Sequence, residues 1–172
     1  MLDVFTAAAL LAATMTTGIG AGVFQLYNFA IMPGLGRTDD RTFVGAFQQI
    51  DTAIVGPFLL VFFIGPLGFA ALAAAVHLGD DDRSALAWIA SALVLQLAMA
   101  VMTVRVNVPL NDGIKAAGAP DRIADLAEVR QQFNETKWVR WNLVRVVTTT
   151  AAFGFLAWAL VVHGRATTPG GT

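Results

Sequence analysis

The chain has 172 residues, of which 56% are hydrophobic and 13% are charged, and its formal net charge is −1. Soluble domains carry about a quarter charged residues, so this composition excludes an ordinary water-soluble fold and indicates an integral membrane protein. The near-neutral charge, without a long Lys/Arg run, excludes nucleic acid as a partner. The absence of cysteine excludes disulfides, thiolate metal sites and thiol redox chemistry.

Four apolar stretches are long enough to cross a bilayer, because a spanning helix needs about 20 such residues. They are residues 4–32, 52–77, 85–104 and 143–163. We therefore predict one all-α domain over residues 1–165, an integral membrane antiparallel four-helix bundle. The Gly/Thr/Pro-rich residues 166–172 are expected to form a disordered tail.

The first stretch is expected to remain as a helix rather than to be removed as a signal peptide. Asp3 precedes it, no Lys or Arg does, and its apolar run exceeds the roughly 7–15 residues of a signal-peptide core. Gly18 and Gly22 share a helix face, where small residues let a neighbouring helix approach closely. Pro33 and Gly34 predict the end of this helix.

The connection from the first to the second stretch carries a helix of its own. Asp39 or Asp40 is a candidate N-cap for this helix. An apolar face follows, made of Phe43, Phe47, Ile50 and Ile54. This helical spacing predicts an amphipathic extension that leads into the second stretch. Gly-Pro pairs at 56–57 and 65–66 predict one or two kinks there, which neighbouring helices accommodate in membranes.

The other two connections differ in length. The acidic residues 79–83 predict a short turn, which makes the second and third stretches an antiparallel hairpin. Residues 108–112, Val-Pro-Leu-Asn-Asp, predict a non-helical turn. Residues 120–137 then predict a polar helix that continues into the fourth stretch.

The distribution of Lys and Arg predicts the orientation of the chain. The two long connections carry Arg37, Arg41, Arg105, Lys115, Arg122, Arg130, Lys137 and Arg140. The opposite side carries Arg83 and Arg165. The predicted spans indicate a multi-pass protein of the cell membrane, and the cytoplasmic loops of such proteins are enriched in Lys and Arg. Its long connections, with their helical extensions, would lie in the cytoplasm and both termini outside.

Polar and aromatic side chains within the apolar stretches gather, in this topology, toward the cytoplasmic side. They are Gln25, Tyr27 and Asn28 in the first stretch, Arg105 and Asn107 at the end of the third, and Trp138, Trp141, Asn142 and Arg145 around the start of the fourth. Each polar group in hydrocarbon is costly, so this set requires a structural or a functional reason.

Two interpretations of this set stay open. In the structural one, the tryptophans form an interfacial belt, Arg145 reaches lipid phosphates or pairs with Asp51 or Asp112, and the amides join helices. In the functional one, the set forms a pocket open to the membrane interface. Its aromatic walls would hold a flat lipophilic small molecule, and its Arg, Asn and Gln donors would bind the oxygens of that molecule.

A metal site is not predicted. His77 and His163 lie at the outer ends of the second and fourth stretches, and they are more typical of solvated helix ends than of ligands to a metal or a haem. Residues 80–82, three aspartates, are typical of a solvated turn. The sequence contains no Glu-x-x-His pair, no phosphate-binding Gly-rich loop and no G-x-S-x-G motif.

Three motifs together resemble the anthrone oxygenase-like family of small four-helix membrane proteins. The first is the Gly-rich segment 18–22, which is followed by Ile-Met-Pro at 31–33. The second is Asn-Val-Pro-Leu-Asn at 107–111, and the third is Trp-x-x-Trp-Asn-x-x-Arg at 138–145. The last two are fairly specific in combination, and the resemblance covers nearly the whole chain.

Most members of that family have no assigned activity, and the named ones oxidise an anthrone to an anthraquinone with O₂, without metal or flavin. The resemblance therefore implies a cofactor-free oxygenase, in which Arg145, Asn142 and Asn107 are candidate catalytic residues. Candidate substrate-binding residues are Gln25, Tyr27, Asn28, Arg105, Asn111, Trp138 and Trp141.

Such a reaction requires a substrate carbanion that itself reduces O₂, so the protein has to favour deprotonation and stabilise an oxyanion. Candidate donors to that oxyanion are Arg145, Arg105, Asn142 and Gln25. The proton acceptor stays open among Asp51, Asp112, Tyr27 and hydroxide from the interface.

The alternative is a non-catalytic membrane protein that binds lipid or quinone or serves as an accessory subunit. A transporter or channel is disfavoured, since no charged residue lies near the predicted midplane of the bilayer. Membrane lipids and a lipophilic small molecule are the expected partners. The sequence leaves open whether the chain forms a homo-oligomer.

Overall fold

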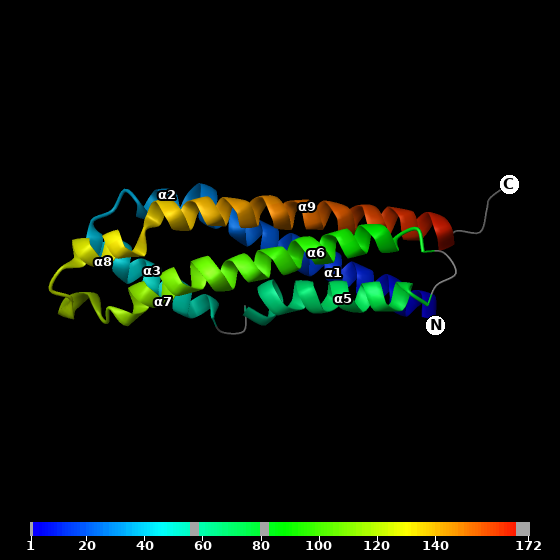
Figure 1. Ribbon diagram of the computed structural model, residues 1–172, viewed down its shortest axis with the longest axis horizontal. Helices are drawn as coiled ribbons and strands as arrows, with labels where there is room; N and C mark the ends of the chain where they lie inside the picture. Colours follow the sequence, from blue (N-terminus) through cyan, green and yellow to red (C-terminus); the bar gives the residue numbers. More distant parts are fainter. Residues whose placement is uncertain (1, 56–58, 80–82, 168–172) are drawn as a thin grey trace.

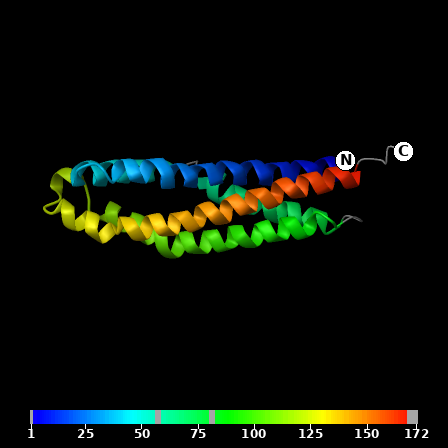
Figure 2. The same ribbon diagram turned by 90° about the horizontal axis from the view of Figure 1, so that it is seen from above.

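The computed structural model describes residues 2–55, 59–79 and 83–167. Helices make up nearly all of this part of the chain and no described residue belongs to a strand, which confirms the predicted all-α class. The long helices run side by side along one axis, and the start of the first and the end of the last lie at the same end (Figures 1 and 2). Most of the predicted tail lies outside the described residues.

Four helices pack around a common interior. Helix α9 (Glu135–Thr167) packs against α1 (Leu2–Leu26) and α6 (Leu86–Met102), and α5 (Gly65–His77) packs against the same two helices. Small side chains fill much of the space between them, namely Ala9, Ala13, Ala70, Ala73, Ala92, Ala152 and Ala159. Small residues let helix backbones approach closely, as is typical of helix packing in membranes.

Glycine contributes to this close packing at one of the two expected positions. A Cβ atom on Gly18 would lie 2.8 Å from Cε2 of Phe153 on α9, so a larger residue there would displace the Phe153 ring. A Cβ atom on Gly22 would meet nothing within 4 Å. Of the two glycines, Gly18 therefore lies in a close contact between α1 and α9, whereas Gly22 has no close neighbour.

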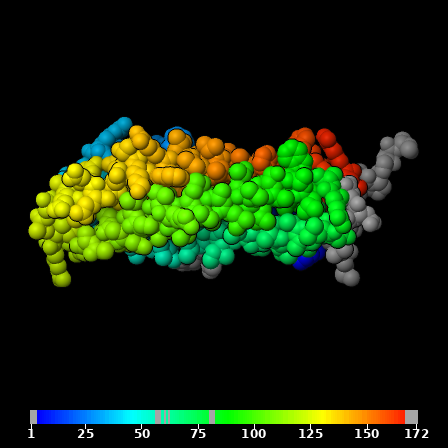
Figure 3. All heavy atoms as spheres, viewed as in Figure 1, coloured from blue at the N-terminus to red at the C-terminus, as the bar shows by residue number. Residues whose placement is uncertain are grey.

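The outer surface is apolar along most of its length. Large exposed side chains include Leu11, Met15 and Ile19 on α1, Val94, Leu97 and Val101 on α6, and Val147, Trp158 and Val161 on α9. Figure 3 shows the face formed by α6 and α9 with the helix that follows α6. Three segments, Val4–Leu35, Leu86–Ala116 and Leu126–Ala166, are long and apolar enough to cross a bilayer. These features fit a membrane protein.

The second predicted stretch is not one continuous helix. Helix α3 (Asp40–Ile54) ends at the beginning of this stretch, a π-helical turn η2 (Leu60–Ile64) follows, and α5 is a shorter apolar helix of 13 residues. The predicted kink at Gly56 and Pro57 falls outside the described residues. The stretch 52–77, predicted to cross the bilayer as one helix, thus contains the end of α3 and, later in the chain, the separate helix α5.

Two prolines that were expected to end helices lie instead within continuing ones. A π-helical turn η1 (Tyr27–Ile31) joins α1 to α2 (Met32–Leu35), and η3 (Thr103–Asn107) joins α6 to α7 (Val108–Ala116). The prediction that residues 108–112 form a non-helical turn is therefore wrong, and the first helix continues past Pro33.

The wider turn explains how each helix continues past its proline. Proline lacks the backbone N–H of an α-helical hydrogen bond, and its ring clashes with the carbonyl four residues earlier. In both turns the ladder shifts to bonds five residues long, from Met32 N to Tyr27 O and from Val108 N to Thr103 O. Pro66 likewise follows η2 by two residues. Each bulge thus opens the backbone just before the proline, as π-bulges do inside α-helices.

Helix α3 confirms the predicted amphipathic extension. The side chain of Asp39 accepts hydrogen bonds from the backbone N–H and the hydroxyl of Thr42, which makes Asp39 the N-cap. The backbone N–H of Thr42 is the main cause that lowers the pKa of Asp39. Phe43 and Phe47 are buried, and Ile50 and Ile54 pack against the same cluster.

The polar segment before α9 differs from the single helix predicted for residues 120–137. It contains a short turn of 3₁₀-helix, η4 (Pro120–Arg122), and then α8 (Leu126–Phe133), whose N-cap is Asp125. Asn134 adopts a left-handed conformation with φ of 54°, which ends α8 before α9 begins. Asparagine tolerates this conformation better than most residues, and the break lets the chain change direction.

An aromatic cluster joins α3, α8 and α9 at the end of the molecule opposite the termini. Its rings belong to Tyr27, Phe43, Phe47, Phe133 and Trp138. The Phe47 ring lies 4.5 Å from that of Phe133 and 5.9 Å, edge to face, from that of Trp138. Such aromatic pairs stabilise a fold by about 0.5–1.5 kcal/mol beyond the burial of their area.

Arg130 on α8 ties the connection before α3 to this cluster. Its Nη1 donates to the carbonyl of Thr38 at 2.9 Å and to Asp40 at 3.0 Å. Its Nη2 donates to the carbonyl of Gly36 at 3.1 Å, and its guanidinium carbon lies 4.3 Å from the centre of the Phe43 ring. One planar side chain therefore satisfies two loop carbonyls and also covers an aromatic ring.

We predict that Arg130→Ala lowers the free energy of unfolding by about 2 kcal/mol. The estimate rests on the loss of charge-assisted hydrogen bonds, each typically about 1.5–3 kcal/mol, reduced because the site is partly exposed to solvent. Thermal denaturation of the purified protein in detergent measures the effect. Arg122→Ala is the matched control, since Arg122 is exposed and forms no ion pair among the described residues. Equal melting temperatures for the two variants would contradict the assignment.

Candidate functional site

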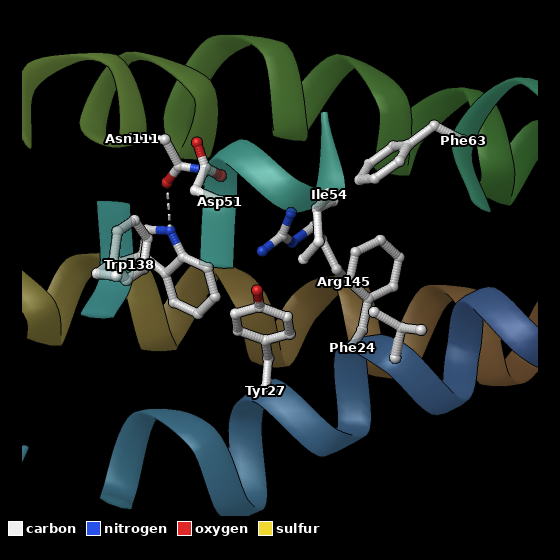
Figure 4. Close-up of a pocket in the computed structure, with 10 residues that line it drawn as sticks. Phe24, Tyr27, Asp51, Ile54, Phe63, Asn111, Trp138 and Arg145 are labelled. Atoms are coloured by element: carbon white, nitrogen blue, oxygen red, sulfur yellow. Dashed lines mark hydrogen bonds between the residues drawn. The ribbon is translucent and has the colours of Figure 1, made fainter. Parts of the chain in front are cut away.

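A small cavity lies beside the aromatic cluster, where α1, η1, α3, η2, α7 and α9 meet. Its walls are formed by Val23, Phe24, Tyr27, Phe47, Asp51, Ile54, Phe63, Asn111, Trp138 and Arg145 (Figure 4). Its volume is about 50 Å³. A single water needs about 10–15 Å³, so the cavity has room for a few water molecules or for O₂. A tricyclic aromatic would need the walls to move.

Arg145 occupies one wall of this cavity. It lies on α9, is only 4% exposed and forms no ion pair among the described residues. Its Nη2 donates to Oδ1 of Asn142 at 2.8 Å, and its Nε has no hydrogen-bond partner within the described part of the chain. Burying a guanidinium without an opposite charge is costly, so its environment has to compensate by other means.

Aromatic rings supply part of this compensation. The guanidinium carbon of Arg145 lies 4.6 Å from the centre of the Phe24 ring and 5.2 Å from that of Trp138. A cation over an aromatic face is stabilised by about 2 kcal/mol when both groups are desolvated. In Figure 4 the guanidinium extends between the Tyr27 hydroxyl and Asp51. The charge is therefore directed into the cavity.

A chain of amides fixes the position of Arg145. Asn142 accepts from Arg145 through its oxygen, and its Nδ2 donates to the Phe24 carbonyl at 3.0 Å and to Oδ1 of Asn28 at 3.2 Å. Asn142 and Asn28 are both buried. The Phe24 carbonyl lies just before η1, so the first and last helices are joined at the level of the cavity.

The opposite wall carries a second set of polar groups. Asp51 on α3 accepts a hydrogen bond from Nδ2 of Asn111 at 2.6 Å and pairs with Nζ of Lys115 at 2.7 Å. The oxygen of Asn111 accepts from Nε1 of Trp138 at 2.8 Å. Lys115 also pairs with Asp112 at 3.2 Å. Two polar groups of α7 therefore bind one buried carboxylate.

The structure brings together four of the predicted catalytic and substrate-binding residues, along with Asp51, a candidate proton acceptor. Tyr27, Asn111, Trp138 and Arg145 line the cavity, and Asn142, itself bonded to Asn28, holds Arg145 from behind. Asn107 is fully buried, but it lies behind the wall and donates to the Trp138 carbonyl at 3.4 Å.

Three predicted residues lie elsewhere. Gln25 donates to the hydroxyl of Thr150 at 3.3 Å on the outer side of α1 and α9, in a surface groove distinct from the cavity. Arg105 is exposed on η3, and Trp141 is partly exposed and is not part of the cavity wall. Gln25 and Arg105 would have to move substantially to act as donors at this site.

Several wall residues were not among the predicted binding residues. Phe24, Phe47, Ile54 and Phe63 supply apolar walls, and Asp51 had been considered only as a proton acceptor or partner for Arg145. Only the amphipathic spacing of α3 pointed to Phe47 and Ile54, since it placed them on an inward face. No pattern in the sequence distinguishes Phe24 or Phe63 from phenylalanines that face lipid.

An apolar groove on the outer surface adjoins the cavity. It is lined by Val23, Leu26, Tyr27, Ile31, Ile50, Ala53 and Ile54, and its volume is about 370 Å³. Val23, Tyr27 and Ile54 belong to both the groove and the cavity wall. These three side chains therefore separate the cavity from the outer surface between α1 and α3.

The two histidines meet at the end of the molecule where the chain begins. Their rings lie 5.2 Å apart, edge to face, and His77 is fully buried, with Nδ1 2.7 Å from the Ala73 carbonyl. His77 is thus not a solvated helix end as expected. No group of three or more His, Asp or Glu side chains suited to a metal occurs within residues 2–55, 59–79 and 83–167. The acidic residues 80–82 lie outside this part.

Comparison with known proteins bears on the part of this site that α7 and α9 contribute. A family model described as anthrone oxygenase matches residues 53–155, from the end of α3 to the middle of α9. The matched part contains the motifs at 107–111 and 138–145 and covers more than half of the chain. The comparisons with curated proteins and with solved structures gave no match. The chain belongs to the anthrone oxygenase family.

Proposed function

We propose that this protein uses O₂ to oxidise a lipophilic phenolic polycyclic aromatic, of which an anthrone is the simplest representative. The observation that carries the proposal is the buried guanidinium of Arg145, which faces a largely apolar cavity and forms no ion pair among the described residues. Such a group is suited to bind negative charge that develops on a ligand.

The chemistry of an anthrone matches this arrangement. Its reactive carbon lies between two aryl rings, opposite a ketone, so removal of a proton from that carbon places negative charge on the ketone oxygen. Arg145 would bind this oxyanion, and Asn142 would keep the guanidinium in position. The rings of Phe24 and Trp138 provide flat apolar walls for a planar substrate. The resulting carbanion would react with O₂ directly, without a metal or flavin.

The groove between α1 and α3 offers a route for such a substrate. A polycyclic aromatic partitions into the bilayer, and the groove is apolar and faces outward. Because Tyr27 and Ile54 separate groove and cavity, their side chains would have to rotate to admit a tricyclic compound. O₂ also concentrates in hydrocarbon and would reach the cavity by the same path.

Arg145→Met is predicted to reduce anthrone oxidation by about 100-fold or more, since removal of one oxyanion donor typically costs about 10²–10³ in rate. The measurement is O₂ consumption together with anthraquinone absorbance, with purified protein in vesicles and vesicles alone as blank. Arg105→Met is the control, because it removes an exposed arginine from the neighbouring η3. Wild-type oxidation no faster than the blank, or equal rates in both variants, would contradict the proposal.

The second candidate is a non-catalytic protein that binds a lipid or quinone or serves as an accessory subunit. The size of the inner cavity, about 50 Å³, favours it, because pockets for small molecules usually measure about 300–1,000 Å³. The same experiment separates the two functions. Saturable binding of an anthrone by the wild-type protein, without O₂ consumption above the blank, would support the non-catalytic function.

We further propose that the aromatic cluster lies on the cytoplasmic side and that both ends of the chain lie outside. The Lys/Arg bias supports this orientation, since the connections near α3, α7 and α8 carry most of the basic residues.

The absence of cysteine makes this orientation directly testable. We predict that a membrane-impermeant maleimide labels Ser84→Cys in intact cells and labels Ala119→Cys only after the membrane is permeabilised. Both positions are exposed, and they lie at opposite ends of α6 and its continuation α7. The cysteine-free parent protein gives the background. The reverse labelling pattern would show the opposite orientation.

A further inference from the structure

We infer that Asp51 is the proton-transfer residue of this site, taking a proton from the bound substrate and returning it to the oxygen-derived product. The inference rests on the proposed oxidation. Asp51 is 8% exposed and is the single carboxylate among the described residues that line the cavity. In Figure 4 it lies beside Asn111 and faces the Arg145 guanidinium, on the side away from the Tyr27 hydroxyl.

The hydrogen bonds around Asp51 determine which way its neighbours face. Trp138 Nε1 is only a donor, so it requires the oxygen of Asn111. The Asn111 amide group then necessarily presents its Nδ2 to Asp51, at 2.6 Å. Asp51 therefore receives one fixed donor on Oδ1, and Trp138 links this donor to the wall that a planar substrate would contact.

Lys115 allows Asp51 to exist in two protonation states. When Asp51 is ionised, Lys115 pairs with it at 2.7 Å and with Asp112 at 3.2 Å. If Asp51 becomes neutral by accepting a proton, Lys115 keeps the partly exposed Asp112 as its counter-charge. Protonation of Asp51 thus does not leave Lys115 without a counter-charge. An unpaired lysine would cost free energy and would oppose the proton transfer.

The two walls carry opposite charges. Asp51 on one wall can accept the substrate proton, while Arg145 on the other binds the negative charge that remains on the substrate. The substrate C–H bond breaks, its proton goes to Asp51, and its electron pair moves through the ring to the ketone oxygen beside Arg145. The carbanion then reduces O₂, a C–O bond forms, and Asp51 returns the proton to give a hydroperoxide. Removal of the second C–H proton forms the new ketone as the O–O bond breaks and hydroxide leaves. That hydroxide combines with the removed proton to give one water molecule.

The other candidates for the proton acceptor fit less well. Asp112 is 63% exposed, does not line the cavity and is linked to Asp51 only through Lys115. The Tyr27 hydroxyl points into the cavity, but a phenol is protonated at neutral pH and so acts as a donor. Tyr27 is therefore placed to hydrogen-bond a substrate or product oxygen rather than to remove the first proton.

The variant Asp51→Asn keeps the size of the side chain and removes its basicity. It is therefore used to measure substrate binding and turnover separately. Anthrone binding is measured by equilibrium dialysis without O₂, and turnover is measured as O₂ consumption. We expect the affinity to change by less than about threefold, while turnover falls by about 10²–10⁴, the usual contribution of a general base. Asp121→Asn, which removes an exposed carboxylate that pairs with Arg41 away from the cavity, is expected to keep turnover within about threefold of wild type.

A spectroscopic readout checks the proton transfer itself. Without O₂, the wild-type protein should convert bound anthrone to its coloured enolate, and Asp51→Asn should not. If Asp51→Asn fails to fold, the pair Asp51→Glu and Asp51→Gln replaces it, and enolate should form with Glu and be absent with Gln. Turnover or enolate formation in Asp51→Asn equal to wild type would overturn the inference. Absence of turnover in the wild-type protein would instead contradict the proposed oxidation itself.

Discussion

A buried positive charge that pairs with no carboxylate within the described part of the chain constrains the structure around it. Arg145 is almost fully removed from solvent, and its guanidinium contacts one amide oxygen and two aromatic faces. These groups reduce the cost of burying the charge but do not neutralise it. Asn142 therefore has to be held rigidly, and its bonds to the Phe24 carbonyl and Asn28 link α9 to the first helix at this level.

The π-helical turns before the prolines carry polar side chains, and these lie at the same level along the helix bundle. Tyr27 and Asn28 belong to η1, and Asn107 belongs to η3, each just before a proline that the helix has to accommodate. A bulge adds a residue to one turn and rotates the side chains that follow. Asn111 and Lys115 lie beyond the end of α6. Because the helix continues past η3 into α7, both residues reach Asp51. The same backbone device thus serves both walls of the cavity.

The sequence predicts the helical class, the N-cap of α3 and the inward face of that helix, because those signals are local. It also places Asn142 and Arg145 together, since residues three apart share a helix face. It cannot predict which way Gln25 faces, because α1 is apolar on its lipid side and on its packed side alike. Nor does the sequence predict that helices continue past Pro33 and Pro109, because a proline signals a helix end and a π-bulge equally well.

The division of the second apolar stretch explains why a cavity exists at this level. Had α3 continued straight into α5, one helix would have filled the space beside α1 along the whole bundle. Instead α3 brings Asp51 and Ile54 inward at its C-terminal end, and η2 brings Phe63 from the other direction. The cavity that these residues line faces Arg145 on one side and, through Tyr27 and Ile54, the outer apolar groove on the other. The site thus lies where hydrocarbon on the outside comes closest to the polar groups within.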